Sequence, residues 1–487
     1  MPTATADNLY EQTAAYITTL IDGGTLRAGD RLPSVRKLST QRGVSIATVL
    51  TAYRLLEDAG RIKARPQSGY YVAPRASGVA SEPGMSQPRA KAGPVSISDL
   101  VLKFLQESKA PETVGLGAAV SGCDLLPTRK INRMAASIAR RMPRAASGYD
   151  MPPGCPALRM QLARRAVEFG CALSPDDILT TCGSQEALSI CLRAIARPGG
   201  TVAIESPTYY GVLQTIEMTG LKALELPTCP REGVSLDALQ FALDQGAVQS
   251  CLFVPNFHNP LGFCTSESHK RKLVKMLAER DVPLIEDDIY GDLPFDNKRP
   301  KACKAFDEKG LVLYCSSFSK TLAAGFRVGW CAPGRYYDEV VRLKLFTSLA
   351  TPTLAQLTIA EFMATGGYEH HLRTVRRQYQ KQVARLSQLV SEHFPKGTKI
   401  TRPAGGFVIW VQMPAQIDSM ELHDRAMTKG ISIAPGIIFS PKQKYRNFIR
   451  LNAGLDWSDR VDWAVAKVGE IAHELLTEAS ADARRSS

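Results

Sequence analysis

The segment 316-SSFSKTLAAGFRVGW-330 places a lysine among hydroxyl side chains, directly after the apolar run LVLYC. Ser317, Ser319 and Lys320 therefore stand at the end of a predicted buried strand, and Arg327 follows Lys320 by seven residues. Hydroxyls and an arginine fork are groups that bind phosphate. A lysine amine can form a covalent bond with a carbonyl compound. The segment thus predicts a site that holds a phosphorylated ligand beside a reactive amine.

Short runs rich in Val, Ile and Leu alternate with amphipathic segments from about residue 96 onward. The runs GTVAIE, SCLFVPN, VPLIEDD and LVLYCSS are predicted strands, and SQEALSICLRAIA and ESHKRKLVKMLAERD are predicted helices. This alternation predicts an α/β fold with a mostly parallel sheet that helices cover on both faces. Ligands bind such sheets at the carboxyl ends of the strands, so the polar residues there are candidate site residues.

Three other predicted strands also lead into polar residues. The motif TCGSQEAL starts a helix at Gly183 and Ser184, and the free N–H groups of a helix start attract phosphate. PNFHNPLG contains Asn259, and EDDIYGD contains Asp287 and Tyr290. Pyridoxal 5′-phosphate needs this whole set: a lysine for its aldehyde, a carboxylate for its ring nitrogen and hydrogen-bond donors for its phenolic oxygen. Its phosphate needs hydroxyls, backbone N–H groups and an arginine.

The motifs SFSKTLAAGFRVGW, NPLG, EDDIYGDL and ESPTYYG resemble those of the fold-type I aminotransferases of the aspartate aminotransferase superfamily. The resemblance covers about residues 110–475, with the motifs in the family order. It implies that Lys320 carries the cofactor as an internal aldimine and that Asp287 is the partner of the pyridine nitrogen. Lys320, Asp287 and Tyr290 would be the catalytic residues. Asn259 and Tyr290 would hold the phenolic oxygen. The phosphate ligands that it implies are Ser184, Gln185, Ser317, Ser319 and Arg327.

Three more residues take their expected roles from the same resemblance. Tyr209 in ESPTYYG would stack on the cofactor ring, and Tyr149 in GYDMPPG would reach the phosphate of the neighbouring subunit in a homodimer. Arg450 in FIRLNAG would bind the carboxylate of a substrate or effector. Each residue alone fits an ordinary structural role, such as a helix cap, a core aromatic or a surface ion pair. Their occurrence together at strand ends favours the cofactor site.

Residues 1–74 have the pattern of three helices and a hairpin. Ser34 and Ser45 are predicted to cap the second and third helices, and Gly43 and Gly60 to end them. RIKAR and YYVAP flank the turn PQSG and predict a two-stranded wing. This layout is that of a winged helix-turn-helix domain.

The same region resembles the GntR family of DNA-binding regulators. Residues near the second and third helices and the wing would contact bases or phosphates in double-stranded promoter DNA, and the sequence leaves open which contact is which. The alternative is an ordinary charged surface on a small helical domain. The residues expected to contact DNA are Arg31, Ser34, Arg36, Ser45, Thr48, Arg54, Arg65, Ser68 and Gly69.

Residues 75–95 are rich in Ala, Ser, Gly and Pro, which predicts a flexible linker with a span of roughly 25 Å. Residues 96–487 then form the aminotransferase-like domain, with a large cofactor subdomain over about 145–350 and a small subdomain over 351–487. A GntR-type reader joined to an aminotransferase-like domain resembles the MocR subfamily of bacterial regulators.

The composition favours a polyanion as a binding partner. The net charge is +13, and a hydrophobic fraction of 44% is enough for large cores. Eleven cysteines without a CxxC pair predict reduced thiols and neither a disulfide framework nor a metal site. The first residues lack the features of a signal peptide and no long apolar run is present, so we expect a cytoplasmic, nucleoid-associated protein without a membrane partner.

Two functional classes follow from the sequence. The first is a dimeric transcriptional regulator that senses an amino compound, or pyridoxal phosphate itself, through Lys320. The second is an active aminotransferase that passes an amino group from an amino acid to a 2-oxo acid and retains a DNA-binding arm. The effector, the target genes and the direction of regulation leave no signal in the sequence.

Overall fold

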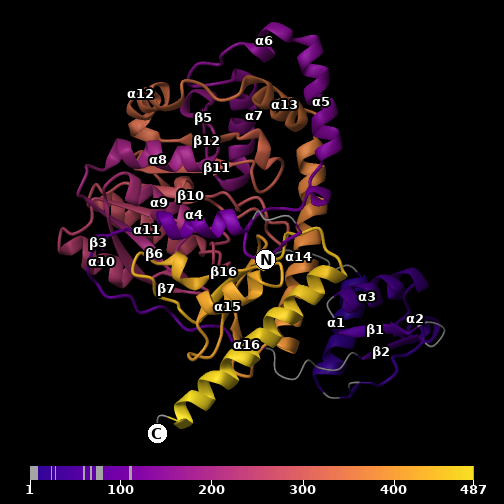
Figure 1. Cartoon of the computed structure of the whole chain (residues 1–487). Coiled ribbons are helices and arrows are strands. Elements are labelled where there is room, and N and C mark those ends of the chain that lie inside the picture. Colours follow the sequence, from indigo (N-terminus) through magenta and orange to yellow (C-terminus); the bar gives the residue numbers. More distant parts are fainter. Residues whose placement is uncertain are drawn as a thin grey trace. The chain divides into compact units, whose positions relative to one another are not determined.

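The computed structural model describes residues 9–23, 25–27, 29–58, 61–65, 69–72, 80–108 and 112–485. The chain divides into two compact units, Met1–Val79 and Ala80–Ser487, which Figure 1 shows in one view. Within the described ranges, no helix combines the length and the apolar character that crossing a bilayer requires.

The first unit has the predicted helices and hairpin. Its elements are α1 (Leu9–Asp22), α2 (Val35–Arg42), α3 (Ile46–Asp58), β1 (Ile62–Arg65) and β2 (Gly69–Val72). The Ser34 hydroxyl accepts a bond from the backbone N–H of Lys37 at 3.3 Å, and the Ser45 hydroxyl accepts one from Thr48 at 3.0 Å. Gly43 ends α2 at a φ of 63°, so both caps and this stop are confirmed. Gly60, the predicted stop of α3, lies outside the described residues.

The second unit is built on a large mixed sheet. Its order is β3-β7-β6-β9-β10-β11-β12-β5, in which β7, β6, β9, β10 and β11 run parallel and β12 runs antiparallel between β11 and β5. The predicted parallel sheet is thus confirmed at its centre. The strands are β3 (Gly93–Pro94), β5 (Leu179–Thr181), β6 (Thr201–Ser206), β7 (Lys222–Cys229), β9 (Ser250–Phe253), β10 (Leu284–Asp287), β11 (Val312–Ser317) and β12 (Gly329–Ala332), with β8 (Gly233–Val234) paired to β7.

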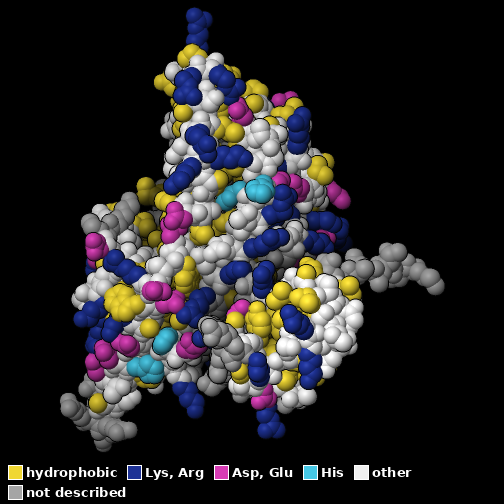
Figure 2. Space-filling model, turned by 90° about the vertical axis from the view of Figure 1, so that its right-hand side faces the viewer, with side chains coloured by type: hydrophobic (Ala, Val, Ile, Leu, Met, Phe, Trp, Pro, Cys, Tyr) yellow, Lys and Arg dark blue, Asp and Glu magenta, His cyan; other side chains and the backbone are white. Residues whose placement is uncertain are grey.

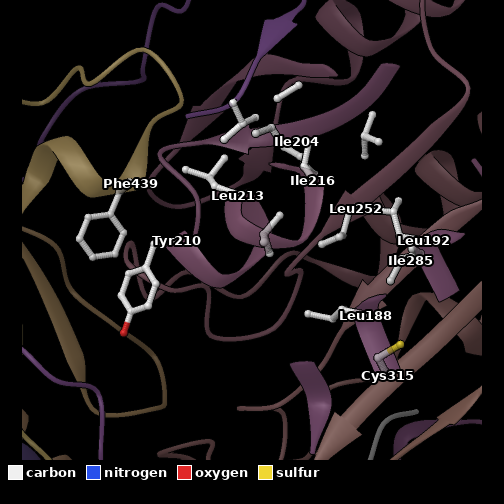
Figure 3. Packing of buried hydrophobic residues seen from close by; sticks show 14 of the residues in the cluster. Leu188, Leu192, Ile204, Tyr210, Leu213, Ile216, Leu252, Ile285, Cys315 and Phe439 are labelled. Carbon is white, nitrogen blue, oxygen red and sulfur yellow. The ribbon is translucent and has the colours of Figure 1, made fainter. Parts of the chain in front are cut away.

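Helices cover both faces of this sheet because alternate strand residues point to opposite sides. On one face, Leu313 and Cys315 pack with residues of α8 and α9. Figure 3 shows Cys315 beside Leu188 of α8. On the other, Tyr314 stacks on Phe169 with ring centroids 5.0 Å apart. The helices are α4 (Ser98–Glu107), α5 (Thr128–Arg141), α6 (Pro143–Ser147), α7 (Pro156–Ala166), α8 (Ser184–Ile195), α9 (Tyr210–Met218), α10 (Leu236–Asp244), α11 (Glu267–Glu279), α12 (Tyr337–Ser348) and α13 (Thr353–Ala364).

A smaller antiparallel sheet, β13-β14-β17-β16, has its own core with the last helices. The subdomain boundary predicted at residue 351 stays a prediction; Ile359 and Phe362 of α13 pack in one core with residues from both sides of it. The elements are β13 (Lys399–Ile400), β14 (Val408–Gln412), β16 (Ala434–Pro435), β17 (Phe448–Asn452), α14 (Gly367–His393), α15 (Ser419–Met427) and α16 (Asp459–Arg485), and β15 (Ile431–Ser432) pairs separately with β4 (Val114–Gly115).

The predicted linker, residues 75–95, differs from the structure in its described part. The backbone of Ser81 accepts a bond from Ile400 of the small sheet, and Ser86 exchanges bonds with Thr228 of β7. Gly93 and Pro94 then form the edge strand β3. Residues 80–95 are therefore attached to the second unit, because backbone groups pair without needing large apolar side chains.

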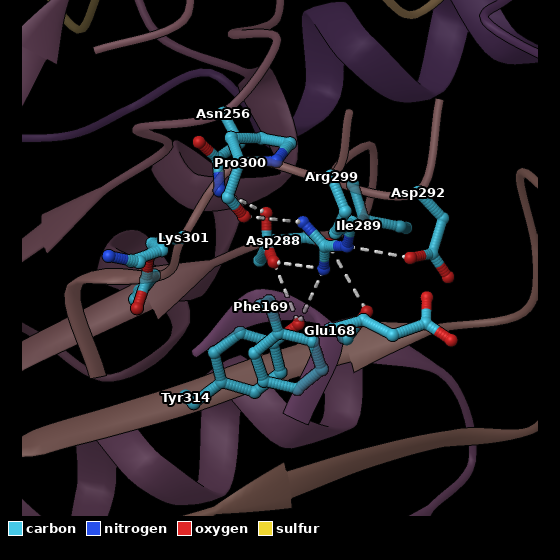
Figure 4. A network of polar contacts seen from close by, with 12 residues as sticks. Glu168, Phe169, Asn256, Asp288, Ile289, Asp292, Arg299, Pro300, Lys301 and Tyr314 are labelled. Carbon is cyan, nitrogen blue, oxygen red and sulfur yellow. Dashed lines mark hydrogen bonds and ion pairs between the residues drawn. The ribbon is translucent and has the colours of Figure 1, made fainter. Parts of the chain in front are cut away.

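A buried network of charges lies behind the end of β10. Arg299 donates to Asp288 at 2.6 Å and contacts Asp292 at 2.7 Å, as Figure 4 shows. Asp288 also accepts from Tyr314 at 2.7 Å and from Asn256 at 2.9 Å. Each buried charge has partners, so the network holds the backbone beside Asp287 in place.

We expect Arg299→Met to destabilise the second unit by about 3–5 kcal/mol, because the substitution leaves Asp288 buried without its cationic partner. Urea unfolding followed by tryptophan fluorescence measures the change. The matched control is Arg335→Met, which removes an arginine from an exposed ion pair with Asp281 and should change stability little. Equal unfolding midpoints for the two variants would contradict a structural role for the network.

Candidate functional site

A pocket of about 120 Å³ opens where β5, β6, β9, β10 and β11 end. These strands point in one direction, so the polar residues after each strand meet at one edge of the sheet. Most of the residues predicted for the cofactor line this pocket together. They are Ser184, Gln185, Tyr209, Asn259, Asp287, Tyr290, Ser319, Lys320 and Arg327, with Val254 and Ile289.

Lys320 lies in the turn after β11, and its Nζ donates to the backbone carbonyl of Ala119 at 2.6 Å. Burial lowers the pKa of Lys320 to about 8, and the positive charge of Arg450 acts in the same direction. Asp287 opposes this shift because its negative charge favours the protonated amine. The amine is thus closer to its neutral, nucleophilic form at neutral pH than a surface lysine is.

Asp287 is the last residue of β10 and is buried. Burial raises the pKa of Asp287 to about 7, while a hydrogen bond from the backbone N–H of Ile289 and the charge of Lys320 lower it. The hydroxyl of Tyr290 is buried in the same pocket without a hydrogen-bond partner among the described residues. An unsatisfied hydroxyl of this kind is a donor that a ligand can use.

Arg450 of β17 is fully buried and approaches the pocket from the small sheet. Its Nη1 donates to Oδ1 of Asn259 at 3.0 Å, and its Nη2 donates to the backbone carbonyl of Gly117. Its Nε has no hydrogen-bond partner among the described residues. The carbonyl oxygen of Asn259 is thus directed to Arg450, which leaves the amide N–H₂ group of Asn259 as a donor for a ligand.

One end of the pocket has the features of an anion site. Ser184 begins α8 after Gly183, whose φ is 86°, and a Cβ at Gly183 would lie 2.5 Å from Arg327 Nη2. Glycine is therefore required for the arginine to approach the helix start. Arg327 also donates to Ser319 at 3.4 Å, so a guanidinium, a hydroxyl and free helix N–H groups converge.

Four predicted residues differ in part from their expected positions. Arg450 bonds to Asn259 in the wall of the pocket but does not itself line it. Ser317 does not line the pocket; its hydroxyl donates to Val328 and accepts from the backbone N–H of Ser319, so it supports Ser319 from behind. Gln185 borders the pocket but its amide is bonded to Gly211 and Thr215. Tyr149 is 78% exposed and lines a separate surface hollow.

The segment Gly117–Ser121 is a part of the site that sequence reasoning missed. Its carbonyls accept from both Arg450 and Lys320, and the Ser121 hydroxyl donates to the Lys320 carbonyl at 3.3 Å. Tyr379 of α14 in turn donates to Ser121 at 2.7 Å. Backbone carbonyls carry no residue signature, so no motif could have shown this arrangement.

In the first unit, most residues predicted to contact DNA lie on the surface. Arg36 and Arg54 are exposed, and the hydroxyls of Ser45 and Thr48 lie 2.8 Å apart at the start of α3. The Arg31 guanidinium lies close to Gly69, which is the residue of β2 next to the turn of the wing. Ser34 caps α2. Ser68 and the side chain of Arg65 lie outside the described part of the chain.

Two family models match the chain in succession. The model for bacterial regulatory proteins of the gntR family matches residues 9–72, and the model for aminotransferase class I and II matches residues 124–461. The HTH-type transcriptional regulator YdcR of Escherichia coli K12 is 38% identical over 467 residues, which are 96% of this chain and 99% of YdcR. The chain belongs to the MocR subfamily of GntR regulators. MocR proteins join a GntR reader to an aminotransferase domain, which is the architecture observed.

Solved aminotransferases share the fold of the second unit of this MocR protein. Pyrococcus horikoshii kynurenine aminotransferase, in complex with PMP, has a TM-score of 0.72 and 29% identity, and the match covers 77% of this chain and 94% of that one. LysN of Thermus thermophilus, complexed with N-(5′-phosphopyridoxyl)-L-leucine, has a TM-score of 0.71 and 27% identity, covering 79% and 100%. Family and neighbours indicate pyridoxal 5′-phosphate as the cofactor. The unpartnered Tyr290 hydroxyl and the Gly183–Arg327 anion site fit this group.

We expect the rate at which added pyridoxal phosphate becomes covalently attached to the protein to rise as pH increases through about 8, because only neutral Lys320 is nucleophilic. Arg450→Leu removes a nearby positive charge, which raises the pKa of Lys320 and moves the midpoint to higher pH. Stopped-flow absorbance across a pH series measures both. Substitution of the exposed Arg335 by Leu should leave the midpoint unchanged. An unchanged midpoint in Arg450→Leu would contradict the assignment of Lys320 as the nucleophile.

Proposed function

We propose that this protein is a transcriptional regulator that binds promoter DNA as a homodimer and senses an amino compound in the pocket around Lys320. The observation that supports this most directly is that Lys320 and Asp287 line one pocket, with Arg450 bonded to Asn259 in its wall, in a chain that also matches the gntR family. In this proposal the first unit binds DNA and the second unit binds a small ligand.

Bound pyridoxal phosphate supplies an aldehyde that reacts with primary amines and a ring that withdraws electrons. Lys320 is the amine of the chain that we propose joins the aldehyde covalently. Asp287 would hold a proton on the ring nitrogen, and a cationic ring would favour the ionised form of Asp287 as the charge of Lys320 does. Ser184, Ser319 and Arg327 would hold the phosphate.

The effector is expected to carry both an amino group and a carboxylate. The carbonyls of Gly117 and Ala119 occupy the donors of Arg450 and Lys320. A carboxylate is a stronger acceptor for a guanidinium than a neutral carbonyl is, so it can replace Gly117 at Arg450. Binding of an amino acid would then displace the Gly117–Ser121 segment from the position described above. This displacement is the proposed signal.

Tyr149 supports the proposal of a homodimer. Its side chain is exposed and outside the pocket of its own subunit, where an aromatic hydroxyl has little to pack against. We propose that it reaches the phosphate site of the partner subunit.

We expect the protein with added cofactor to be yellow and Lys320→Ala to be colourless, because the covalent bond needs the Lys320 amine. Borohydride reduction followed by peptide mass spectrometry locates the bond. A reduced adduct on any other lysine would refute the assignment to Lys320. Lys344→Ala serves as a matched control, since this buried lysine pairs with Glu186 outside the pocket.

We expect DNA affinity to fall steeply with salt, and Arg36→Ala with Arg54→Ala to reduce the salt slope by about 0.9 for each phosphate that is no longer neutralised. Fluorescence anisotropy with a promoter duplex at several salt concentrations measures the slope. Lys272→Ala on α11 is the control and should behave as the unchanged protein. Salt-independent binding would contradict phosphate binding by these residues.

An aminotransferase is the second candidate, because Asp287 and Tyr290 line the pocket and Arg450 bonds to Asn259 in its wall. Single-turnover spectra with a panel of amino acids separate the two functions. Rapid release of a 2-oxo acid favours the enzyme, and a stable amino-acid complex without release favours the sensor.

A further inference from the structure

One edge of the second unit carries positive charge that the cofactor site does not use. Arg129, Arg133 and Arg140 on α5 are exposed, as are Arg373 and Arg377 on α14. We call these five residues the basic edge. Figure 1 shows α5 above α14 along one side of the unit, and Figure 2 looks onto that side, where Lys and Arg side chains gather.

The arrangement on α5 follows the helix period. Positions 129, 133 and 140 are separated by four and seven residues, so the three arginines project from one face. The opposite face is apolar and buried, with Ile131 in the core that includes α13. From Arg129 to Arg140 the helix rises about 16 Å, which matches about five base pairs of B-DNA.

Among the residues that the structure describes, no carboxylate pairs with the basic edge. The sequence has no Asp or Glu between Asp124 and Asp150, and none between Glu369 and Glu392. None of the five arginines forms an ion pair within the described part of the chain, whereas neighbouring Arg141 pairs with Glu361. Arginines on one face without counter-charges repel one another, and a polyanion relieves that repulsion.

We infer that the basic edge binds the sugar-phosphate backbone of duplex DNA outside the sites that the winged helix unit contacts. This inference rests on the proposed DNA binding. Charge complementarity selects the partner, since DNA is the polyanion that the GntR unit already recruits. Arginine binds phosphate through a planar fork, and such contacts add affinity without reading sequence.

The test compares two full-length variants of equal net charge, +8 from the original +13 after five charges are removed. The edge variant changes Arg129, Arg133, Arg140, Arg373 and Arg377 to Gln. The control variant changes five exposed lysines elsewhere on the same unit, Lys222, Lys272, Lys298, Lys396 and Lys429, to Gln. Uptake of the cofactor verifies that both variants are folded.

Anisotropy titrations use two duplexes. The short duplex is limited to the operator sequence that the winged helix unit contacts, and the long duplex adds flanking DNA. On the long duplex, the edge variant should lose up to about 4.5 from the salt slope for each subunit whose edge contacts the DNA, so that between 50 and 200 mM salt its affinity falls up to about 500-fold less per such subunit than that of the unchanged protein. On the short duplex it should match the unchanged protein. The control variant should keep the original slope on both.

Equal slopes for the edge and control variants on the long duplex would overturn the inference. A loss that is the same on both duplexes would also overturn it, because it would place the edge at the operator itself. Arg36→Ala with Arg54→Ala separates this failure from that of the proposed function. If that variant loses binding while the edge variant does not, only the further inference fails.

Discussion

Parallel strands end at a common edge, and this alignment determines where the chemistry of the protein lies. β6, β9, β10 and β11 run side by side in one direction, so residues from four distant parts of the sequence meet around Lys320. Burial disfavours the charged form of Lys320 and of Asp287 alike. Their pKa values of about 8 and about 7 approach each other for that reason.

The charge balance of the pocket favours anions. Lys320, Arg327 and Arg450 contribute positive charge, and Asp287 alone among the lining residues opposes them. A phosphate at one end would neutralise the charge of Arg327, and a carboxylate at the other end would neutralise the charge of Arg450. The same edge of the sheet therefore suits a phosphorylated cofactor together with an amino acid, and the neutral carbonyls of Gly117 and Ala119 are weaker substitutes.

The sequence predicted those features that depend on local residue patterns. Strand-end motifs indicated most of the pocket, and the helix caps at Ser34 and Ser45 were evident from residue type. The phosphate-binding role of Ser317 stays a prediction, because motif order cannot show that its hydroxyl points to Val328 and Ser319. Residues 80–95 look like a linker since their attachment depends on backbone bonds. The Arg299 network left no signal because Asp288 and Asp292 precede Arg299 in a stretch without a regular helix or strand, so no periodicity indicates that they pair.

Cys123 lies directly after the segment Gly117–Ser121, whose backbone carbonyls accept hydrogen bonds from Lys320 and Arg450. All eleven cysteines lie in the described ranges, and Cys123 is the exposed one. It stands two residues beyond Ser121, anchored by a bond from its backbone N–H to Asp456 at 3.0 Å. A fluorophore attached to this thiol would therefore respond to displacement of the neighbouring carbonyls. The native chain thus contains a labelling position beside its own ligand pocket.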